Sequence, residues 1–224
     1  MIEIQDLYFH RQEGQQSRNV IQALNLSLNK GDQLALLGDS GAGKTTLLHI
    51  MAGMLSASKG RVQINNIALH HCTKAELALY RRTVGLIFQH YQLLEALNVG
   101  DNILFQWRLQ APDVSPSHMQ EQLLSLAGTL GIEHKLRSYP HQLSGGEQQR
   151  VAIARALIHA PKVVFADEPT GNLDQQRSIE VVELLTNLCK KHEINLVMVT
   201  HSHQLAQRFS SIKQMKDGQL QCLN

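Results

Sequence analysis

Apolar positions in the first part of the chain follow the patterns of β-strands. Residues 2–4 (IEI) form a short apolar run, and residues 20–28 (VIQALNLSL) alternate apolar with polar side chains. A turn at residues 29–31 (NKG) leads into residues 33–38 (QLALLG), an apolar run that ends in glycine. A period of two is typical of a strand with one buried face, and a continuous apolar run of this length is typical of a buried strand.

The middle of the chain carries helical spacing. Residues 44–55 (KTTLLHIMAGML) predict a helix directly after the buried strand, and residues 91–159 show few strand signals. Residues 110–118 (QAPDVSPSH) contain two prolines and two serines, which predicts a loop between two of the helices in this region.

The last third returns to strands. Residues 162–168 (KVVFADE) and 194–200 (INLVMVT) are rich in apolar and β-branched residues, which is typical of central strands in a parallel sheet. Residues 178–192 between them predict a crossover helix. Two short strand patterns, 212–216 and 219–223, are joined by Asp-Gly and predict a hairpin. The whole pattern predicts an α/β fold with an inserted helical lobe.

Composition and charge narrow the class of protein. With 224 residues, the chain has room for one large domain or two small ones. A net charge of +2, from 21 Lys+Arg against 19 Asp+Glu, provides no basic footprint, so we expect no nucleic-acid partner. Three scattered cysteines (Cys72, Cys189 and Cys222) have neither disulfide nor metal-ligand spacing, which suits a reducing cytoplasm. Neither a leader pattern nor an apolar run of about 18 residues is present, which predicts a chain that does not itself cross a membrane.

Residues 38–46 (GDSGAGKTT), called the phosphate loop below, lie between the predicted buried strand and the first helix. Their spacing fits G-x-x-x-x-G-K-[ST], in which glycines let the backbone curl so that its N–H groups point at phosphates. Lys44 is expected to contact the β- and γ-phosphates, and the Thr45 hydroxyl is expected to bind Mg²⁺. A glycine-rich turn without function is the alternative, but the flanking strand and helix favour a nucleotide site. The predicted nucleotide contacts are Gly38, Asp39, Ser40, Gly41, Ala42, Gly43, Lys44, Thr45 and Thr46.

Two adjacent carboxylates, Asp167 and Glu168, follow the apolar run that precedes them. Ligands in open α/β sheets bind at the carboxyl ends of the strands. Asp167 is therefore predicted to hold the magnesium shell, and Glu168 to orient or deprotonate the attacking water. On its own such a pair is more often a solvated strand end, and the upstream phosphate loop is what favours the catalytic interpretation.

Residues 143–147 (LSGGE), called the signature segment below, precede a predicted helix. Ser144 can cap that helix, because its oxygen can accept a bond from a free amide of the first turn. The paired glycines, Gly145 and Gly146, leave main-chain N–H groups uncovered at the positive end of the helix, where an anion is favoured. This segment is predicted to be half of a phosphate site.

Three further segments accompany these motifs: Gln89 in GLIFQ, GNLD at 171–174 and VTHSH at 199–203. All of them occur in the order found in the nucleotide-binding subunits of ATP-binding cassette (ABC) transporters. The chain resembles these subunits over nearly its full length. The resemblance implies a P-loop NTPase (RecA-like) core with an antiparallel β subdomain and an inserted α-helical subdomain. It implies one ABC ATPase domain over residues 1–224, with residues 1–89 and 160–224 as the core and 90–159 as the helical subdomain.

The resemblance also implies ATP hydrolysis by a head-to-tail homodimer that holds two MgATP molecules. In each copy, Ser144, Gly145, Gly146 and Glu147 are expected to cover the ATP on the partner's phosphate loop. Asp174 is expected to lie across the interface. Family likeness gives the catalytic residues as Lys44, Gln89, Glu168 and His201, and the magnesium ligands as Thr45, Gln89 and Asp167.

Arg11 departs from the family pattern. The family places an aromatic residue near this position to stack on adenine, whereas Tyr8 and Phe9 lie slightly early in this chain. A guanidinium group can also stack on a flat ring, so Arg11 is predicted to cover the base, with His10 as a substitute. The alternative is that Arg11 is an ordinary solvated arginine.

A transport role requires separate permease subunits, and the resemblance places this chain on the cytoplasmic face of the membrane through them. Residues 90–103 include an apolar set that is expected either to contact the permease or to pack within the helical lobe: Tyr91, Leu93, Leu94 and Leu97. The chain is most similar to the macrolide-export and lipoprotein-release group, although Glu95 replaces a usual proline and Asn98 a usual threonine. The alternative is a soluble cassette without a permease, of the iron–sulfur assembly type.

Overall fold

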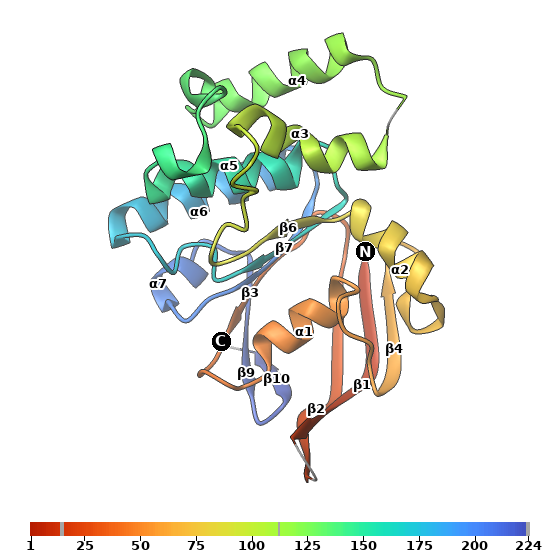
Figure 1. The fold of residues 1–224 in the computed structure, drawn as a ribbon. Helices are drawn as coiled ribbons and strands as arrows, with labels where there is room; N and C mark the ends of the chain where they lie inside the picture. Colours follow the sequence, from red (N-terminus) through yellow and green to blue (C-terminus); the bar gives the residue numbers. More distant parts are fainter. Residues whose placement is uncertain (14–15, 112, 223–224) are drawn as a thin grey trace.

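A computed structural model describes residues 1–13, 16–111 and 113–222; Pro112 of the predicted loop and Leu223 of the predicted hairpin lie outside these ranges. The strands form two sheets (Figure 1). A six-stranded sheet has the order β10-β9-β3-β8-β7-β6, and a four-stranded sheet, whose paired strands are all antiparallel, has the order β2-β1-β4-β5. The strands are β1 (Ile2–Glu13), β2 (Gln16–Leu28), β3 (Gln33–Leu37), β4 (Lys59–Ile64), β5 (Ile67–Ala68), β6 (Gly85–Ile87), β7 (Val163–Asp167), β8 (Asn195–Val199), β9 (Ser211–Lys216) and β10 (Gln219–Cys222).

Helices cover both faces of the six-stranded sheet (Figure 1). The α-helices are α1 (Lys44–Met51), α2 (Lys74–Arg82), α3 (Val99–Gln110), α4 (Pro116–Thr129), α5 (Gly145–Leu157), α6 (Gln175–Lys191) and α7 (His203–Ala206). Short 3₁₀ turns occupy Leu69–His71, Glu133–Lys135 and Pro140–Gln142. Helices α3, α4 and α5 gather above the sheet, and the four-stranded sheet lies beside α1 on the other side.

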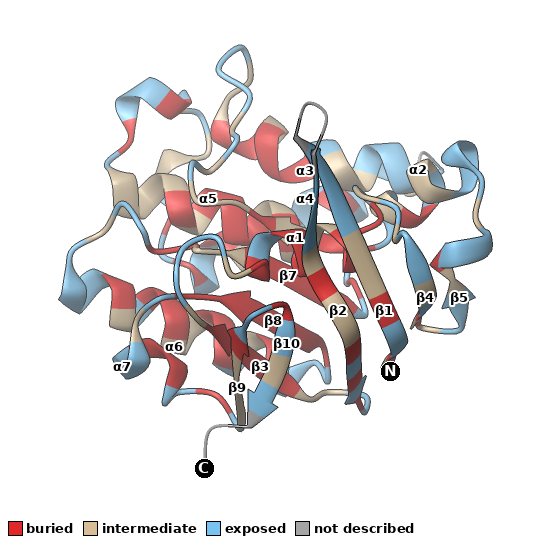
Figure 2. Cartoon of the chain, turned by 90° about the horizontal axis from the view of Figure 1, so that it is seen from below, coloured by how far each residue is buried: buried red, intermediate tan, exposed pale blue. Residues whose placement is uncertain are grey.

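The buried side chains form one cluster on each face of the six-stranded sheet, and Figure 2 shows them concentrated between the layers. Alternate residues of one strand belong to different clusters: Ala35 and Leu37 pack with α3 to α6, whereas Leu34 and Leu36 pack with α1 and the four-stranded sheet. The period of two therefore persists in a strand that is buried on both faces.

The predicted α/β fold, with an antiparallel sheet and a helical insertion, is confirmed, but several predicted boundaries were wrong. The first helix ends at Met51 rather than residue 55, because Gly53 turns the chain into a left-handed conformation (φ 68°). The predicted loop at 110–118 is shorter than expected, because α4 already begins at Pro116 with Ser115 as its cap. The crossover helix begins three residues early, at Gln175, where Asp174 caps it.

Several elements were not predicted. Strand β4 (KGRVQI) has only two buried positions, and α7 is only four residues long, so neither shows a clear period. Helix α2 did carry a readable signal, since Thr73 and Glu76 form a capping box before it. Asn98 caps α3 through a bond from the amide of Asp101, a role that threonine also fills, so this departure from the family pattern preserves the local structure.

Candidate functional site

Strand register brings the predicted site residues to one edge of the six-stranded sheet. Ile87 pairs with Ala166, Asp167 with Val199, and Leu36 with Val199. Because the strands run parallel, the residues that follow them, among them Gln89, Glu168, His201 and Gly38, leave the sheet at similar heights. Some of these residues are more than 100 positions apart in the sequence, and the parallel register brings them to the same edge of the sheet.

The phosphate loop curls around main-chain atoms. Lys44 is buried, and its Nζ donates to the carbonyl oxygens of Gly38 (2.7 Å) and Asp39 (2.8 Å). Gly43 has φ 103°, and a β-carbon there would lie 2.8 Å from Met215 Cε and 3.0 Å from Val20 O. A larger residue at this position is therefore excluded both by backbone strain and by space. A loop with glycines at positions 38, 41 and 43 beside a buried ammonium group fits a polyphosphate.

Thr45 and Asp167 meet at the base of the loop. The Thr45 hydroxyl donates to Asp167 Oδ1 at 3.0 Å. Burial raises the pKa of Asp167, and the hydrogen bond from Thr45 partly offsets this effect. A hydroxyl and a carboxylate placed together beside a phosphate loop are the oxygen ligands that suit Mg²⁺.

Glu168 lies in a strained backbone conformation next to His201. Its φ is 44°, and its main chain is fixed by a bond from its N–H to Val199 O (3.1 Å) and from the Gly171 N–H to its carbonyl (3.0 Å). His201 Nδ1 lies 3.4 Å from Glu168 Oε2. Non-glycine residues with positive φ concentrate at functional sites, because the surrounding structure must compensate for their strain.

Gln89 joins this group through the segment that follows Glu168. A β-carbon on Gly171 would lie 2.8 Å from Gln89 Nε2, so the glutamine side chain packs on that backbone. Asn172 Nδ2 donates to the main-chain oxygen of Gln89 at 2.9 Å. The structure therefore brings Gln89 and Glu168 together through residues 171–172.

The signature segment forms the predicted helix cap. Ser144 accepts a bond from the Glu147 amide, and Glu147 Oε2 accepts from both the amide and the hydroxyl of Ser144, each at 2.8 Å. The hydrogen bond from the Ser144 backbone amide lowers the pKa of Glu147, and the bond from the Ser144 hydroxyl lowers it further. Lys135 Nζ lies 3.2 Å from the other carboxylate oxygen of Glu147. The Glu147 carboxylate is thus held within its own chain, and its contact with nucleotide stays a prediction.

Two other predicted residues lie apart from the catalytic group. Asp174 caps α6 by accepting from the Arg177 amide, and its carboxylate lies 3.3 Å from the Arg177 side chain. Arg11 is exposed on β1 directly opposite Arg18 of β2, two residues before Val20, which borders the phosphate loop. Arg18, which was not predicted as a site residue, is thus a second cation on this part of the hairpin.

Asn172 and Arg155 were not predicted to have a role. Asn172 lies inside the GNLD segment that was recognised, and Arg155 lies in the helix after the signature segment. Arg155 donates to the main-chain oxygens of Tyr91 (2.7 Å) and Gln92 (2.6 Å). Because both residues lie within or next to recognised motifs, a functional role could have been predicted from the sequence. Their hydrogen-bond partners could not, because these lie more than 60 residues away in the sequence.

Comparison with known proteins gives consistent matches. A family model described as ABC transporter matches residues 21–171. The lipoprotein-releasing system ATP-binding protein LolD of Acinetobacter baylyi is 37% identical, covering 97% of this chain and 96% of the relative. The uncharacterized ABC transporter ATP-binding protein YbbA of Escherichia coli (strain K12) is 38% identical, covering 99% of this chain and 96% of the relative.

Solved structures agree with these relatives. A dimeric structure of MJ0796, a bacterial ABC transporter cassette, matches with a TM-score of 0.91 at 30% identity, covering 99% of this chain and 97% of its own. A dimeric post-hydrolysis structure of MJ0796 bound to ADP and Pi matches with a TM-score of 0.90 at 29% identity, with the same coverage. The predicted family and ATPase activity are thereby confirmed: the chain belongs to the ABC transporter family, in which it is an ATP-binding subunit that hydrolyses ATP.

Proposed function

We propose that two copies of the chain assemble head to tail around two MgATP molecules and drive a separate membrane permease. The dimer is supported by the positions of two helices: α1 begins within the phosphate loop, α5 begins at the signature glycines, and the two pack on opposite faces of the six-stranded sheet. Within one copy the two half-sites therefore lie on opposite sides of the sheet, so they do not meet on one ATP, and a two-fold pair completes both pockets. The dimeric MJ0796 structures support this arrangement.

Within each pocket we assign the phosphates to the phosphate loop, Gly38 to Thr46, of one copy and to the amides of Gly145 and Gly146 of the other. Lys44 supplies positive charge to the β- and γ-phosphates. Thr45, Asp167 and Gln89 are the residues that would hold Mg²⁺. The ion supplies charge neutralisation at the phosphate oxygens when it is bound. Asp174 lies near the partner's phosphate loop in this arrangement.

The reaction is attack of water on the γ-phosphorus, with cleavage of the bond to the β–γ bridging oxygen and release of ADP. Glu168 accepts the proton of the attacking water, and His201 holds the Glu168 carboxylate in place while its ring faces the γ-phosphate. Gln89 orients the water from the neighbouring strand. Positioning and electrostatic stabilisation provide most of the catalysis, because phosphoryl transfer needs little covalent chemistry from the protein.

Replacing Glu168 tests this function. Glu168→Gln should bind ATP but hydrolyse it at least about 100-fold more slowly, as expected for loss of a general base. Because ATP then persists, the dimer should accumulate, which light scattering after gel filtration with and without MgATP would detect. Lys44→Ala is the matched control and should lose nucleotide binding itself. Near-normal turnover by Glu168→Gln would remove the residue from this role, and full activity of a strict monomer would exclude the shared pocket.

Arg11 remains a proposed contact to adenine. Its position opposite Arg18, on the hairpin that borders Gly43 through Val20, supports the proposal. Arg11→Ala should weaken ATP binding about three- to thirtyfold, the effect of losing a stacking cation. Fluorescent-nucleotide titration of the monomer measures this, with Arg61→Ala on β4 as a control. Equal affinities for all three proteins would show that Arg11 is solvated.

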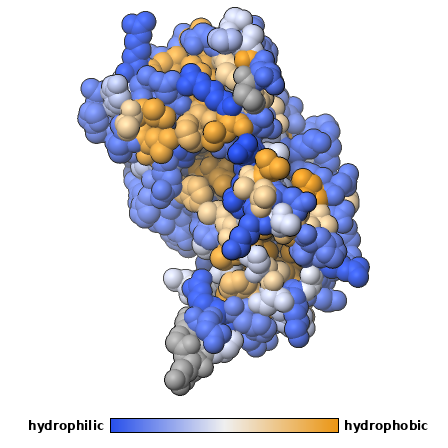
Figure 3. Space-filling model, turned by 45° about the vertical axis from the view of Figure 1, so that its right-hand side comes forward, coloured by the Kyte–Doolittle hydropathy of each residue, from blue (hydrophilic) through white to orange (hydrophobic). Residues whose placement is uncertain are grey.

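The permease partner follows from the family and from a groove beside the helical lobe, which we assign to residues 90–159. Within the described residues, the helices all fall short of the length and apolar character needed to cross a membrane. A groove of about 330 Å³ is lined by Leu86, Phe88, Leu94 and Phe105, and Figure 3 shows hydrophobic surface around the hollow on this face. We propose that a cytoplasmic segment of the permease binds here, which would place the chain on the cytoplasmic face of the membrane.

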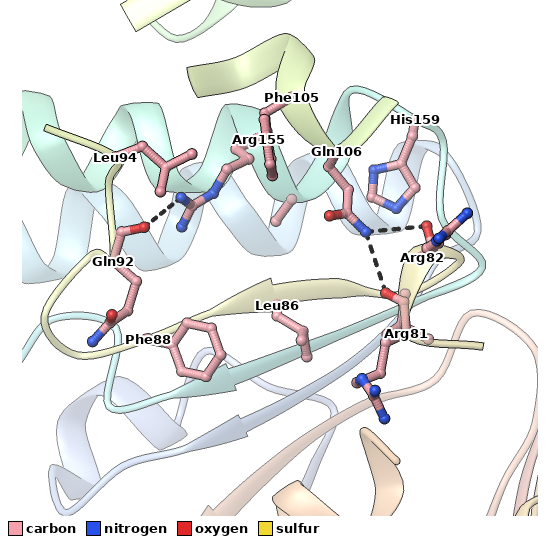
Figure 4. Close-up of a pocket in the computed structure, with 12 residues that line it drawn as sticks. Arg81, Arg82, Leu86, Phe88, Gln92, Leu94, Phe105, Gln106, Arg155 and His159 are labelled. Atoms are coloured by element: carbon pink, nitrogen blue, oxygen red, sulfur yellow. Dashed lines mark hydrogen bonds between the residues drawn. The ribbon is translucent and has the colours of Figure 1, made fainter. Parts of the chain in front are cut away.

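The charges around the groove indicate the chemistry of that segment. Arg81, Arg82 and Arg155 line it, and among its lining residues that the structure describes there is no carboxylate (Figure 4). Arg155 bonds only to backbone oxygens in the structure, as does Arg81, which donates to Gly53 O at 2.8 Å. An apolar segment that carries carboxylates fits this surface. The lipoprotein-releasing relatives favour outward extrusion of lipoprotein- or peptide-type cargo.

Purification from detergent-solubilised membranes tests the permease assignment. Tagged wild-type protein should retain an integral membrane protein whose presence changes the ATPase rate. Recovery of soluble partners alone would favour the alternative of a cassette that works without a permease.

A further inference from the structure

Tyr91 lies where three functional segments of one chain meet. A β-carbon on Gly145 of the signature segment would lie 3.1 Å from the Tyr91 hydroxyl oxygen and 3.7 Å from Leu173 Cδ2. Burial raises the pKa of Tyr91, and a hydrogen bond from the Asn172 side chain partly offsets this effect. The hydroxyl group therefore lies against the signature segment, and Leu173, of the segment that follows Glu168, borders the same glycine.

The main chain of Tyr91 is held by the same helix that its hydroxyl contacts. Tyr91 and Gln92 have positive φ values of 58° and 51°, a conformation that bulky residues rarely adopt. Arg155 fixes it by donating to the carbonyl oxygens of both residues, at 2.7 and 2.6 Å, and Figure 4 shows the bond to Gln92. Helix α5 thus holds the tyrosine at both ends, through Arg155 near its last turn and Gly145 in its first.

Asn172 extends the contact from Tyr91 to Gln89. Its Nδ2 donates to Gln89 O at 2.9 Å and lies 3.4 Å from His90 Nδ1. The preceding residue, Gly171, packs against the Gln89 side chain and donates its N–H to Glu168 O. The Tyr91 phenol thus lies between the signature glycines and the backbone around Gln89 and Glu168.

We propose that Tyr91 is a positioning residue that couples the two ATP sites of the dimer. The proposal rests on the proposed head-to-tail dimer, in which Gly145 contacts the ATP on the partner while Gln89 and Glu168 of the same chain act on their own. Tyr91 touches neither nucleotide. It sets the position of Gly145 relative to Gln89, so that closure over one ATP aligns the hydrolytic residues at the other.

Tyr91→Phe tests the hydroxyl alone. In the Glu168→Gln background, ATP-dependent dimerisation should weaken about three- to tenfold, the range for one neutral hydrogen bond. In the otherwise wild-type protein, kcat and the Hill coefficient for ATP should fall, whereas ATP binding to the monomer should stay unchanged. Tm should fall by no more than about 2–4 °C, because the contacts of the hydroxyl lie within one chain. Tyr8→Phe removes the same atom from a half-buried tyrosine on β1 and should match the parent in every measurement.

The contact with Gly145 gives a second test. Gly145→Ala places a methyl group against the hydroxyl and should weaken dimerisation, and Tyr91→Phe should recover part of that loss by removing the oxygen. Strictly additive effects, or a Tyr91→Phe protein that dimerises and hydrolyses ATP cooperatively like its parent, would overturn the proposal. Failure of Glu168→Gln itself to dimerise with ATP would instead reject the dimer on which the proposal rests.

Discussion

At the scale of single residues, His159 is a buried side chain whose environment disfavours its charged form. It is 7% exposed at the end of the groove, and neither ring nitrogen has a hydrogen-bond partner within the described residues. Burial lowers its pKa to about 4, against smaller opposing effects of the Val84 and Arg155 backbone. Arg82 and Arg155 line the same groove and add further positive charge.

This environment predicts a loss of stability in mild acid. The unfolded chain binds a proton near the ordinary histidine pKa of about 6.5, whereas the folded chain resists it until about pH 4. Stability is therefore complete above pH 6.5 and falls by about 2 kcal/mol by pH 5. His159→Leu removes the titrating group without breaking a hydrogen bond, so its Tm should fall less between pH 7.5 and pH 5. His134→Leu, at an exposed position, should keep the wild-type pH dependence.

Sequence motifs predict which residues of the site lie close together only where each motif follows a strand of the parallel sheet. Thr45 and Asp167 were predicted to share a metal ion, and their side chains are hydrogen-bonded across 122 positions. Their proximity could be expected from the motifs because each follows its own strand and parallel strands end together, and the shared metal ion stays a prediction. Tyr91 and Arg155 were not predicted as partners, because positive φ values and contacts to backbone oxygens depend on tertiary packing and have no residue pattern of their own.

At the scale of elements, two helices begin with the same motif but only one has a proposed role in ATP binding. Thr73 caps α2 and Ser144 caps α5, each with a glutamate three residues later, and the hydroxyl-to-carboxylate distances are both 2.8 Å. Loss of an N-cap typically costs about 1 kcal/mol. Substitutions at the two caps can therefore be compared to distinguish an effect on helix stability from an effect on ligand binding.

Ser144→Ala and Thr73→Ala should lower Tm to a similar extent, by about 2–4 °C in a protein of this size. Only Ser144→Ala should also weaken ATP-dependent dimerisation in the Glu168→Gln background, because Ser144 is proposed to face the partner's nucleotide. Differential scanning calorimetry and light scattering measure the two effects. If both variants dimerise like their parent, Ser144 serves only as a helix cap.

Prediction of elements from the sequence was reliable for long or strongly apolar segments. Strands β3, β7 and β8 are buried at nearly every position and were located within one or two residues. Strand β4 was missed because the antiparallel sheet leaves one of its faces partly exposed, and only two of its six residues, Val62 and Ile64, have apolar side chains that could show the alternation. The helix after the phosphate loop was predicted too long because residues 52–55 remain apolar after Gly53 has ended it.

At the scale of the whole molecule, the groove beside the helical lobe indicates how ATP hydrolysis is coupled to a bound partner. Its lining combines β6, α2, α3 and α5, and α5 also carries the signature glycines. A segment bound in the groove therefore contacts the helix that closes on the partner's ATP. The apolar set predicted at residues 90–103 is divided: Leu94 is exposed in the groove, whereas Leu93 packs against the cluster above the sheet.

Leu94 and Leu124 allow a controlled test, because both are leucines that are 40% exposed on the same side of the sheet, but only Leu94 lines this groove. Leu94→Ser should weaken binding of the co-purified permease about tenfold, as expected when a side chain that is buried at an interface is lost. Stimulation of ATP hydrolysis by the reconstituted permease should fall in parallel. Leu124→Ser should retain both properties, and the basal ATPase of either variant should equal that of the wild type. Equal losses from the two substitutions would place the permease contact elsewhere on the molecule.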